Sequence, residues 1–407
     1  MSVQEESTKI AIAPPTPLSS CRKERSDMTQ RTKDQREKQC QSYGAHVFED
    51  AGAFEASLDN KPIFTRAFLE KAAEQVEIVR RGESDPNKQF MCLPNVRGDG
   101  HRKLRIPPHA CPAVSLAFHG VFNSASDEGT LPVYHIGTYR HSSKYDFSDT
   151  MVLKPNDTQN TPQQALANRP NREQYNEIPK VLETSLLRSR FWASVREHLN
   201  TLSVQVDNIV CIALGTLHRT EEEGREESDR SASQHMLACA ISTYLSQRYA
   251  ATSSPTSTPT PIPIVARDPS YKIEDMVLLS QCNPPITVVS EPYQYLSITT
   301  STLFMSLYPP SFIPVLQVAA DMTFPTSPAA IIATEVLSHP WHIDGKIHAL
   351  DTWTPRVGRM LECMDATWLG REFADDCPSP DGDGRFEDPC HLIDDWGKNL
   401  VFYARKE

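Results

Sequence analysis

From residue 206 onward, short apolar runs alternate with longer segments in which apolar residues recur at helical spacing. The runs are rich in β-branched residues, as expected for strands buried on both faces: "NIVCIAL", "PIPIVARDP", "ITVVS", "TLFMSLYP" and "AAIIAT". Segments such as "SASQHMLACAISTYLSQRY" and "KIEDMVLLSQC" between them have the helical period, and "PYQYLSI" predicts a short helix. The alternation predicts an α/β fold with right-handed βαβ units and a mostly parallel sheet flanked by helices.

The upstream pattern is different. "FTRAFLEKAAEQVEIVRR" predicts a helix capped by Thr65, with Phe68, Leu69, Ala72, Val76 and Val79 on its apolar face. "PAVSLAFHGVF" and "LPVYHIGTYR" predict a strand pair, and "YNEIPKVLETSLLRSRFWASVREHLNTL" predicts an amphipathic helix.

Composition changes along the chain suggest four regions. The first is polar, mixed in charge and rich in Pro and Ser patches, which is typical of a disordered arm. Near the C-terminus, "NLVFYARKE" predicts either an edge strand or a loose end. The expected regions are a disordered arm (1–42), an N-terminal α+β extension (43–170), the α/β domain (171–370, with a flexible insertion at 251–263) and an acidic, turn-rich C-terminal tail (371–407).

Charge and cysteine content narrow the class of protein. The net charge of −11 argues against nucleic-acid binding, and no apolar run reaches the roughly 20 residues of a membrane span. The N-terminus carries acidic residues where a secretory signal is basic, so we expect a cytoplasmic and/or nuclear protein. Ten cysteines without a Cys-x-x-Cys pair favour buried thiols over a metal or redox site.

Gly215 and Asp268 are the main candidates for binding chemistry. In an open parallel sheet, ligands bind beyond the carboxyl ends of the strands, where Gly215 follows the first α/β strand and Asp268 the second. The segment "GTLHRTEEEG" has one glycine at the turn, so the three-glycine dinucleotide fingerprint is missing, as is a Walker motif. Two interpretations stay open for Gly215, a tight structural turn or the lining of a ligand pocket. Asp268, before Pro269, suits a turn as well as a ribose contact.

The following helix supplies further candidates. A cap at Ser231 or Ser233 would place Gln234 and His235 in its first turn, facing the strand ends, although His235 is also compatible with a solvated position or a cap. The sequence assigns no catalytic residue, cofactor or metal. The predicted ligand-binding residues are Gly215, Thr216, Gln234, His235 and Asp268.

The order of these segments resembles the sensitivity-to-red-light-reduced (SRR-like) domain family, in its fungal form, over roughly residues 170 to 335. The resemblance rests on Gly215, Gln234, Asp268 with Pro269, and the Pro310 to Pro314 region. It implies a Rossmann-like core and regulatory roles: circadian and light signalling in plants, a microtubule-linked role in yeast and a link to haem biosynthesis in animals. No established catalytic residues come with the family.

The sequence therefore leaves two alternative functions open. The first is a regulatory or adaptor protein that acts through protein partners, with a small-molecule site at the strand ends as an addition. The alternative is an enzyme or sensor that binds a nucleotide-like ligand in the crevice near Gly215 and Asp268.

Overall fold

The computed structural model of the chain describes about half of its residues. The expectation of a disordered arm at residues 1–42 falls outside them. The chain divides into a unit Met1–His46, which also lies outside, and a unit Val47–Glu407. The described residues are 61–80, 90–94, 101–105, 114–118, 134–138, 182–217, 224–253, 259–307, 309, 313–336, 341–343, 346–348, 354–371 and 389–407.

A seven-stranded sheet forms the centre of the described residues, in the order β12-β13-β9-β8-β5-β6-β7. Its five parallel strands coincide with the five predicted runs. In chain order they pair as third, second, first, fourth, fifth, which is the strand order of a Rossmann-like domain, with the switch point between β5 and β8. The predicted α/β class is confirmed. These strands are β5 (Asn208–Ile212), β6 (Ile264–Arg267), β7 (Ile286–Val288), β8 (Thr302–Ser306) and β9 (Ala330–Thr334).

Two antiparallel strands complete the sheet next to β9. The tail segment "NLVFYARKE" forms β13 (Leu400–Arg405), which pairs with β9 on one side and with β12 (Met364–Trp368) on the other. The tail strand is thus neither loose nor at the edge, because β12 occupies the edge position.

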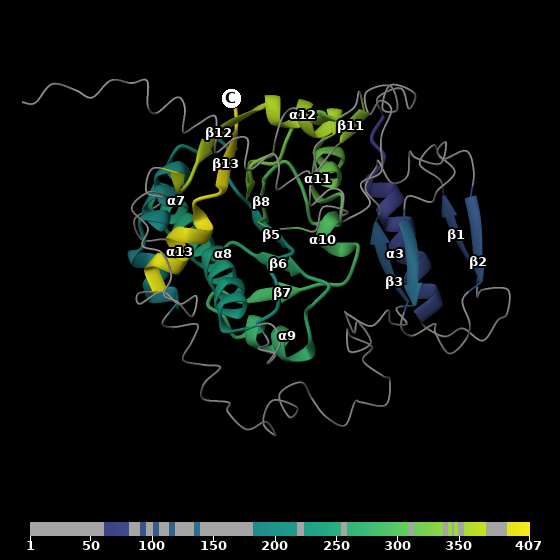
Figure 1. Cartoon of the computed structure of the whole chain (residues 1–407), viewed down its shortest axis with the longest axis horizontal. Coiled ribbons are helices and arrows are strands. Elements are labelled where there is room, and N and C mark those ends of the chain that lie inside the picture. Colours follow the sequence, from purple (N-terminus) through teal and green to yellow (C-terminus); the bar gives the residue numbers. More distant parts are fainter. Residues whose placement is uncertain are drawn as a thin grey trace, which may run out of the picture. The chain divides into compact units, whose positions relative to one another are not determined.

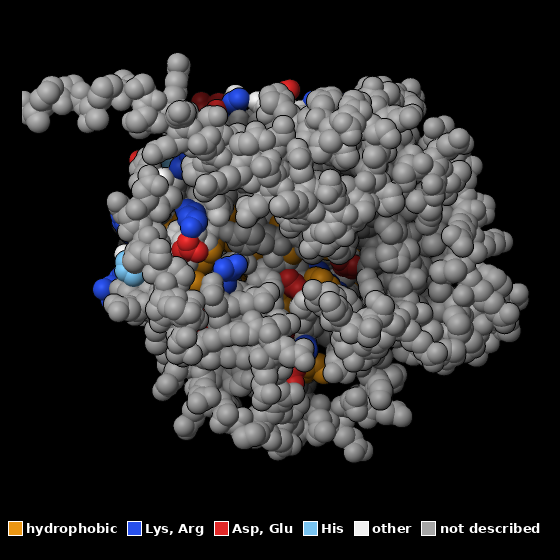
Figure 2. All heavy atoms as spheres, in the orientation of Figure 1, with side chains coloured by type: hydrophobic (Ala, Val, Ile, Leu, Met, Phe, Trp, Pro, Cys, Tyr) orange, Lys and Arg blue, Asp and Glu red, His pale blue; other side chains and the backbone are white. Residues whose placement is uncertain are grey.

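Helices cover both faces of the sheet (Figure 1). On one face, α7 (Arg190–Asn200), α8 (Gly224–Ser253), α9 (Ile273–Ser280) and α13 (Pro389–Gly397) enclose a core with Ile209, Cys211 and Met305. On the other, α10 (Tyr293–Leu296), α11 (Val315–Thr323) and α12 (Pro355–Glu362) enclose a core with Ile212 and Phe304. Alternate residues of β5 thus serve opposite cores, as in a strand buried on both faces. Figure 2, in the same orientation, shows described side chains of both charges, blue and red, beside orange hydrophobic ones.

Two helix predictions need correction. Residues 182–188 are helical, but the chain breaks at Ser189, whose hydroxyl accepts from the Trp192 N–H and caps a new helix, α7. The helix expected to be capped at Ser231 or Ser233 begins earlier, at Gly224, within the charged segment "EEEGREESDR". Its acidic residues Glu226, Glu227 and Asp229 fall in the first turns of α8, where negative charge interacts favourably with the helix dipole.

Upstream of the sheet, the residues that the structure describes between 61 and 138 form one helix and two strand pairs. The predicted helix is α3 (Arg66–Arg80), and the Thr65 hydroxyl accepts from the Phe68 N–H at 3.2 Å, as the cap prediction requires. The predicted strand pair is confirmed as β3 (Val114–Phe118) with β4 (Tyr134–Thr138). A second hairpin, β1 (Phe90–Pro94) with β2 (His101–Arg105), was not predicted, and a small hairpin, β10 (Trp341–Ile343) with β11 (Lys346–His348), follows β9.

Candidate functional site

The turn after β5 depends on Gly215. Ala213 and Gly215 both have positive φ, at 58° and 79°, so the chain leaves the strand through the left-handed region. A Cβ on Gly215 would lie 2.2 Å from the Ser231 hydroxyl oxygen of α8. The backbone thus makes a tight turn at Gly215, and no side chain fits between this turn and α8.

Asp268 holds that turn to the end of β6. Its Oδ2 accepts from the Gly215 N–H at 2.8 Å, and its Oδ1 accepts from the Ser270 N–H, also at 2.8 Å. The side chain is buried. Both oxygens thus bind backbone N–H groups, one between the ends of β5 and β6 and one in the Asp-Pro turn. Asp268 therefore stabilises a turn, which is one of the two interpretations that the sequence left open.

A second buried carboxylate, Asp275, continues this network and was not predicted. The Thr216 hydroxyl donates to it at 2.9 Å, and the N–H groups of Leu217 and Lys272 donate at 2.7 Å each. Asp275 stands at the third position of α9, where it reaches back to the N-cap backbone. An acidic residue three positions after the start of a predicted helix, as in "KIEDM", is the sequence signal that could have identified Asp275.

His235 lies deep in α8 rather than in its first turn. The prediction of a first-turn position for Gln234 and His235 is wrong because α8 begins at Gly224, which places both residues about three turns into the helix. Both side chains are buried.

The hydrogen bonds of His235 define its protonation. Its Nδ1 lies 2.6 Å from the Ser231 carbonyl oxygen, which only accepts, so Nδ1 carries the proton. Its Nε2 lies 2.6 Å from the Tyr271 hydroxyl and accepts from it. Burial lowers the pKa of His235 to about 4, opposed by the Ser231 hydrogen bond and the Asp268 charge. A neutral imidazole thus connects α8 to the turn before α9.

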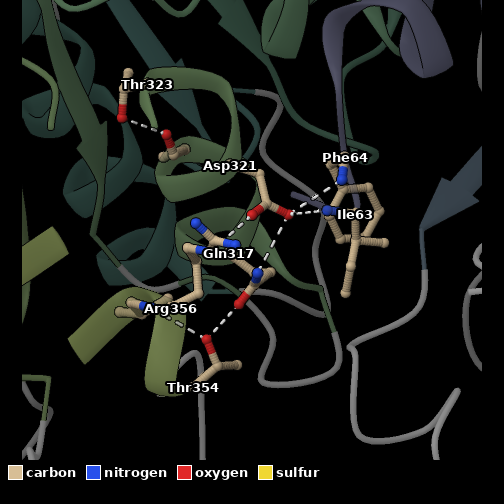
Figure 3. A network of polar contacts seen from close by, with 9 residues as sticks. Ile63, Phe64, Gln317, Asp321, Thr323, Thr354 and Arg356 are labelled. Atoms are coloured by element: carbon tan, nitrogen blue, oxygen red, sulfur yellow. Dashed lines mark hydrogen bonds and ion pairs between the residues drawn. The ribbon is translucent and has the colours of Figure 1, made fainter. Parts of the chain in front are cut away.

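A separate polar cluster lies on the opposite face of the sheet (Figure 3). The Oδ2 of Asp321 in α11 accepts from the backbone N–H groups of Ile63 and Phe64, at 3.0 Å each, and from Gln317 Nε2 at 3.2 Å. Arg356 Nε of α12 lies 3.4 Å from Asp321 Oδ1. We call this cluster the Asp321 clasp.

The surroundings of the Asp321 clasp show that it is a buried contact between residues 63–64 and the helices α11 and α12. The Thr354 hydroxyl donates to Gln317 Oε1, and the Arg356 guanidinium lies 4.2 Å from the centre of the Phe324 ring. Burial raises the pKa of Asp321 to about 6, although the N–H groups, Gln317 and Arg356 act in the opposite direction. Nothing in the sequence placed Asp321 near Ile63, because 258 positions separate them.

Other sequence expectations concern metals and membranes. Among the described residues, no group of three or more His, Cys, Asp and Glu side chains is placed to hold a metal ion. Within the same residues, no helix is long and apolar enough to cross a membrane.

The strand order, the helices on both faces and the polar turn at the switch point define a Rossmann-like α/β domain. A family model, the SRR1 domain, matches residues 163–377, which is just over half of the chain. The chain belongs to the SRR1 domain family. No curated protein and no solved structure gave a significant match.

Proposed function

We propose that this chain is a regulatory or adaptor protein that acts through protein partners, and that the α10–α12 face of its SRR1 domain is where it holds polypeptide. The observation that carries the proposal is the Asp321 clasp. Residues 61–80 lie outside the family match, yet Asp321 binds two successive backbone N–H groups of this segment.

The mode of contact is suited to polypeptide recognition. Phe64 is fully buried in the core beneath α10 and α11, while Asp321 accepts hydrogen bonds from the main chain of Ile63 and Phe64. Arg66 of α3 donates to the carbonyl oxygens of Leu296 and Ile298, at 2.9 and 3.4 Å, at and just beyond the C-terminal end of α10. One inserted aromatic side chain with main-chain hydrogen bonds around it is a common way for a domain to hold a peptide segment.

The test compares three full-length baits in cell extract: the wild-type chain, Asp321→Asn and the surface control Asp365→Asn. We expect the wild type and Asp365→Asn to recover a stoichiometric partner whose cross-links fall on α3 or α10–α12. Asp321→Asn, checked for an intact melting transition, should lose or exchange that partner. The proposal fails if no bait recovers a stoichiometric partner, or if recovery and cross-links are the same for all three.

A second candidate is binding of a nucleotide-like small molecule at the Gly215 turn. It is favoured by the meeting of the turn with α8 and the Asp268 loop at the switch point, where ligands bind in this fold. Its residues are those predicted from the sequence: Gly215, Thr216, Gln234, His235 and Asp268.

A thermal-shift screen with nucleotides, adenosylmethionine, nicotinamide cofactors and haem tests this candidate. A compound that binds only the folded chain raises the melting temperature as it saturates the site. Asp268→Asn should reduce the effect of such a compound, since the carboxylate would be the ribose contact. If no compound raises the melting temperature of the wild type, the candidate is withdrawn.

A further inference from the structure

Two polar side chains end β6 and β8, the two strands that flank β5, on the face of the sheet opposite α8. Arg267 is the last residue of β6 and pairs with Ile212 of β5. Ser306 ends β8, one residue beyond the pair of Met305 with Cys211. Paired residues of parallel strands point to the same face, so Arg267, Ile212 and Ser306 share one face. Ile212 belongs to the core under α10 and α11, so the shared face is the one that α10 and α11 cover.

Gln294 adds a third polar side chain from above the sheet. It lies in α10, which contacts both β5 and β6, and it is fully buried. Its Nε2 donates to Glu291 Oε1 at 3.5 Å. The amide oxygen of Gln294, its own Oε1, takes no part in this hydrogen bond. The next residue, Tyr295, has a pKa raised by burial and by Glu291 and lowered by the charge of Arg267 and by a hydrogen bond with Gln294. The charge of Arg267 therefore acts within electrostatic range of the Tyr295 hydroxyl.

Each of these three side chains has one buried polar atom without a hydrogen-bond partner among the described residues: Arg267 Nε, Ser306 Oγ and Gln294 Oε1. The Nη1 of Arg267 donates to the carbonyl oxygen of Asp268, but no ion pair between described residues includes Arg267. Folded proteins satisfy the great majority of buried polar atoms, and each exception calls for an explanation. Three exceptions at one end of one face point to a bound group that supplies the partners.

The chemistry of the three atoms indicates what that group is. Arg267 and Ser306 present donors, and a guanidinium fork matches carboxylate and phosphate oxygens. The helix that follows β8, α11, begins at this same edge, and its positive end also favours an anion. Gln294 Oε1 is an acceptor, which suits a hydroxyl or amine beside the anion.

We propose that this edge binds the anionic group, phosphate or carboxylate, of a small molecule, with Arg267 and Ser306 as its donors and Gln294 as acceptor for a neighbouring polar group. The site lies at the carboxyl ends of β6 and β8, on both sides of β5 and so at the switch point of the sheet. It goes beyond the binding of polypeptide partners and does not depend on it.

The experiment titrates inorganic phosphate, and separately acetate, into the full chain at constant ionic strength, with the melting temperature as the readout. We expect a saturable rise with at least one anion, and the anion that saturates at the lower concentration names the group. Arg267→Gln should weaken binding about tenfold or more, because a charge-assisted hydrogen bond is lost. Arg267→Lys keeps the charge without the fork and should bind with intermediate affinity.

Two further variants keep the test decisive. Arg359→Gln removes one positive charge from an exposed position of α12 and should bind as the wild type does. Ser306→Ala removes only an unpartnered hydroxyl, so it should fold normally and still bind more weakly, and it decides the matter if Arg267→Gln fails to fold. A non-saturating rise in the wild type, or wild-type affinity in both Arg267→Gln and Ser306→Ala, would overturn the proposal.

Discussion

The backbone N–H of Gly215 donates to Asp268 Oδ2 at 2.8 Å, and this bond ties the ends of β5 and β6 together at the carboxyl edge of the sheet. It holds a turn that only glycine can make, because φ is 79° and the Ser231 hydroxyl occupies the space of a Cβ. The turn that carries the family resemblance is thus a rigid part of the edge on which any ligand would lie.

We predict that Gly215→Ala lowers the free energy of unfolding by at least about 2 kcal/mol, from the left-handed backbone and the overlap with Ser231. Denaturant unfolding of the variant measures it. In the double variant with Ser231→Ala, the hydroxyl is gone and part of the loss should be recovered, while the cost of the positive φ remains. A double variant as unstable as the sum of the single variants would show that the overlap does not matter.

Two buried serines should respond in opposite ways to replacement by alanine. Ser246 Oγ donates to the Ser242 carbonyl oxygen and accepts from the Ile262 N–H, so Ser246→Ala should cost about 1–3 kcal/mol by leaving that N–H unsatisfied. Ser306 Oγ has no partner among the described residues, so Ser306→Ala should leave the stability of the free chain unchanged or raise it by up to about 1 kcal/mol. Equal losses in the two variants would contradict this difference.

His235 and Asp321 should give opposite slopes of stability with pH. The pKa of His235 falls to about 4 in the folded chain, so the unfolded chain binds the extra proton between the folded value and 6.5, and stability rises with pH in that window. The pKa of Asp321 rises to about 6, so the folded chain holds the extra proton between 3.8 and that value, and stability falls as pH rises. Each effect amounts to about 3 kcal/mol, so they largely cancel in the wild type.

The variant Asp321→Asn separates the two slopes, because it removes one titration and leaves the other. The free energy of unfolding of the wild type minus that of Asp321→Asn should decrease as pH rises from about 4 to 6 and then become constant. Urea denaturation at a series of pH values provides the measurement. A difference that increases with pH, or that does not change, would show that ionisation of Asp321 is not opposed by burial.

Sequence patterns predicted the sheet well for a physical reason. Strands β5, β8 and β9 are buried on both faces, so each is a continuous apolar run. Strands β6 and β7 are only partly buried, yet they keep apolar β-branched residues, and the helices between the strands have a clear period. The hairpin of β1 and β2 was missed because "FMCLP" and "HRKLR" carry neither alternation nor a two-residue turn signal. The position of β13 depended on β12, a strand with three exposed residues and therefore little apolar pattern.

The site was predictable only in part. Gly215, Thr216 and Asp268 were found because they follow predicted strands, and the Rossmann-like fold brings such positions to one edge. Contacts such as that of His235 with Tyr271 depend on the residue at which α8 begins. The charged residues around Gly224 give no sharp sequence signal for the start of a helix. In the sequence, Arg267 and Ser306 look like ordinary termini of β6 and β8. Only the structure shows that one buried polar atom of each has no hydrogen-bond partner among the described residues.

Hydrogen–deuterium exchange on the full-length chain, followed across residues 61–80, measures whether Asp321 holds this segment to the SRR1 domain. In the wild type, the peptide containing Ile63 and Phe64 should be protected, since both N–H groups bind a buried carboxylate. In Asp321→Ala that peptide and α3 should lose protection while peptides from β5 and β8 keep theirs, and the control Asp365→Asn should match the wild type. Rapid exchange of the segment in the wild type, or unchanged protection in Asp321→Ala, would contradict the clasp and the polypeptide-binding role that rests on it.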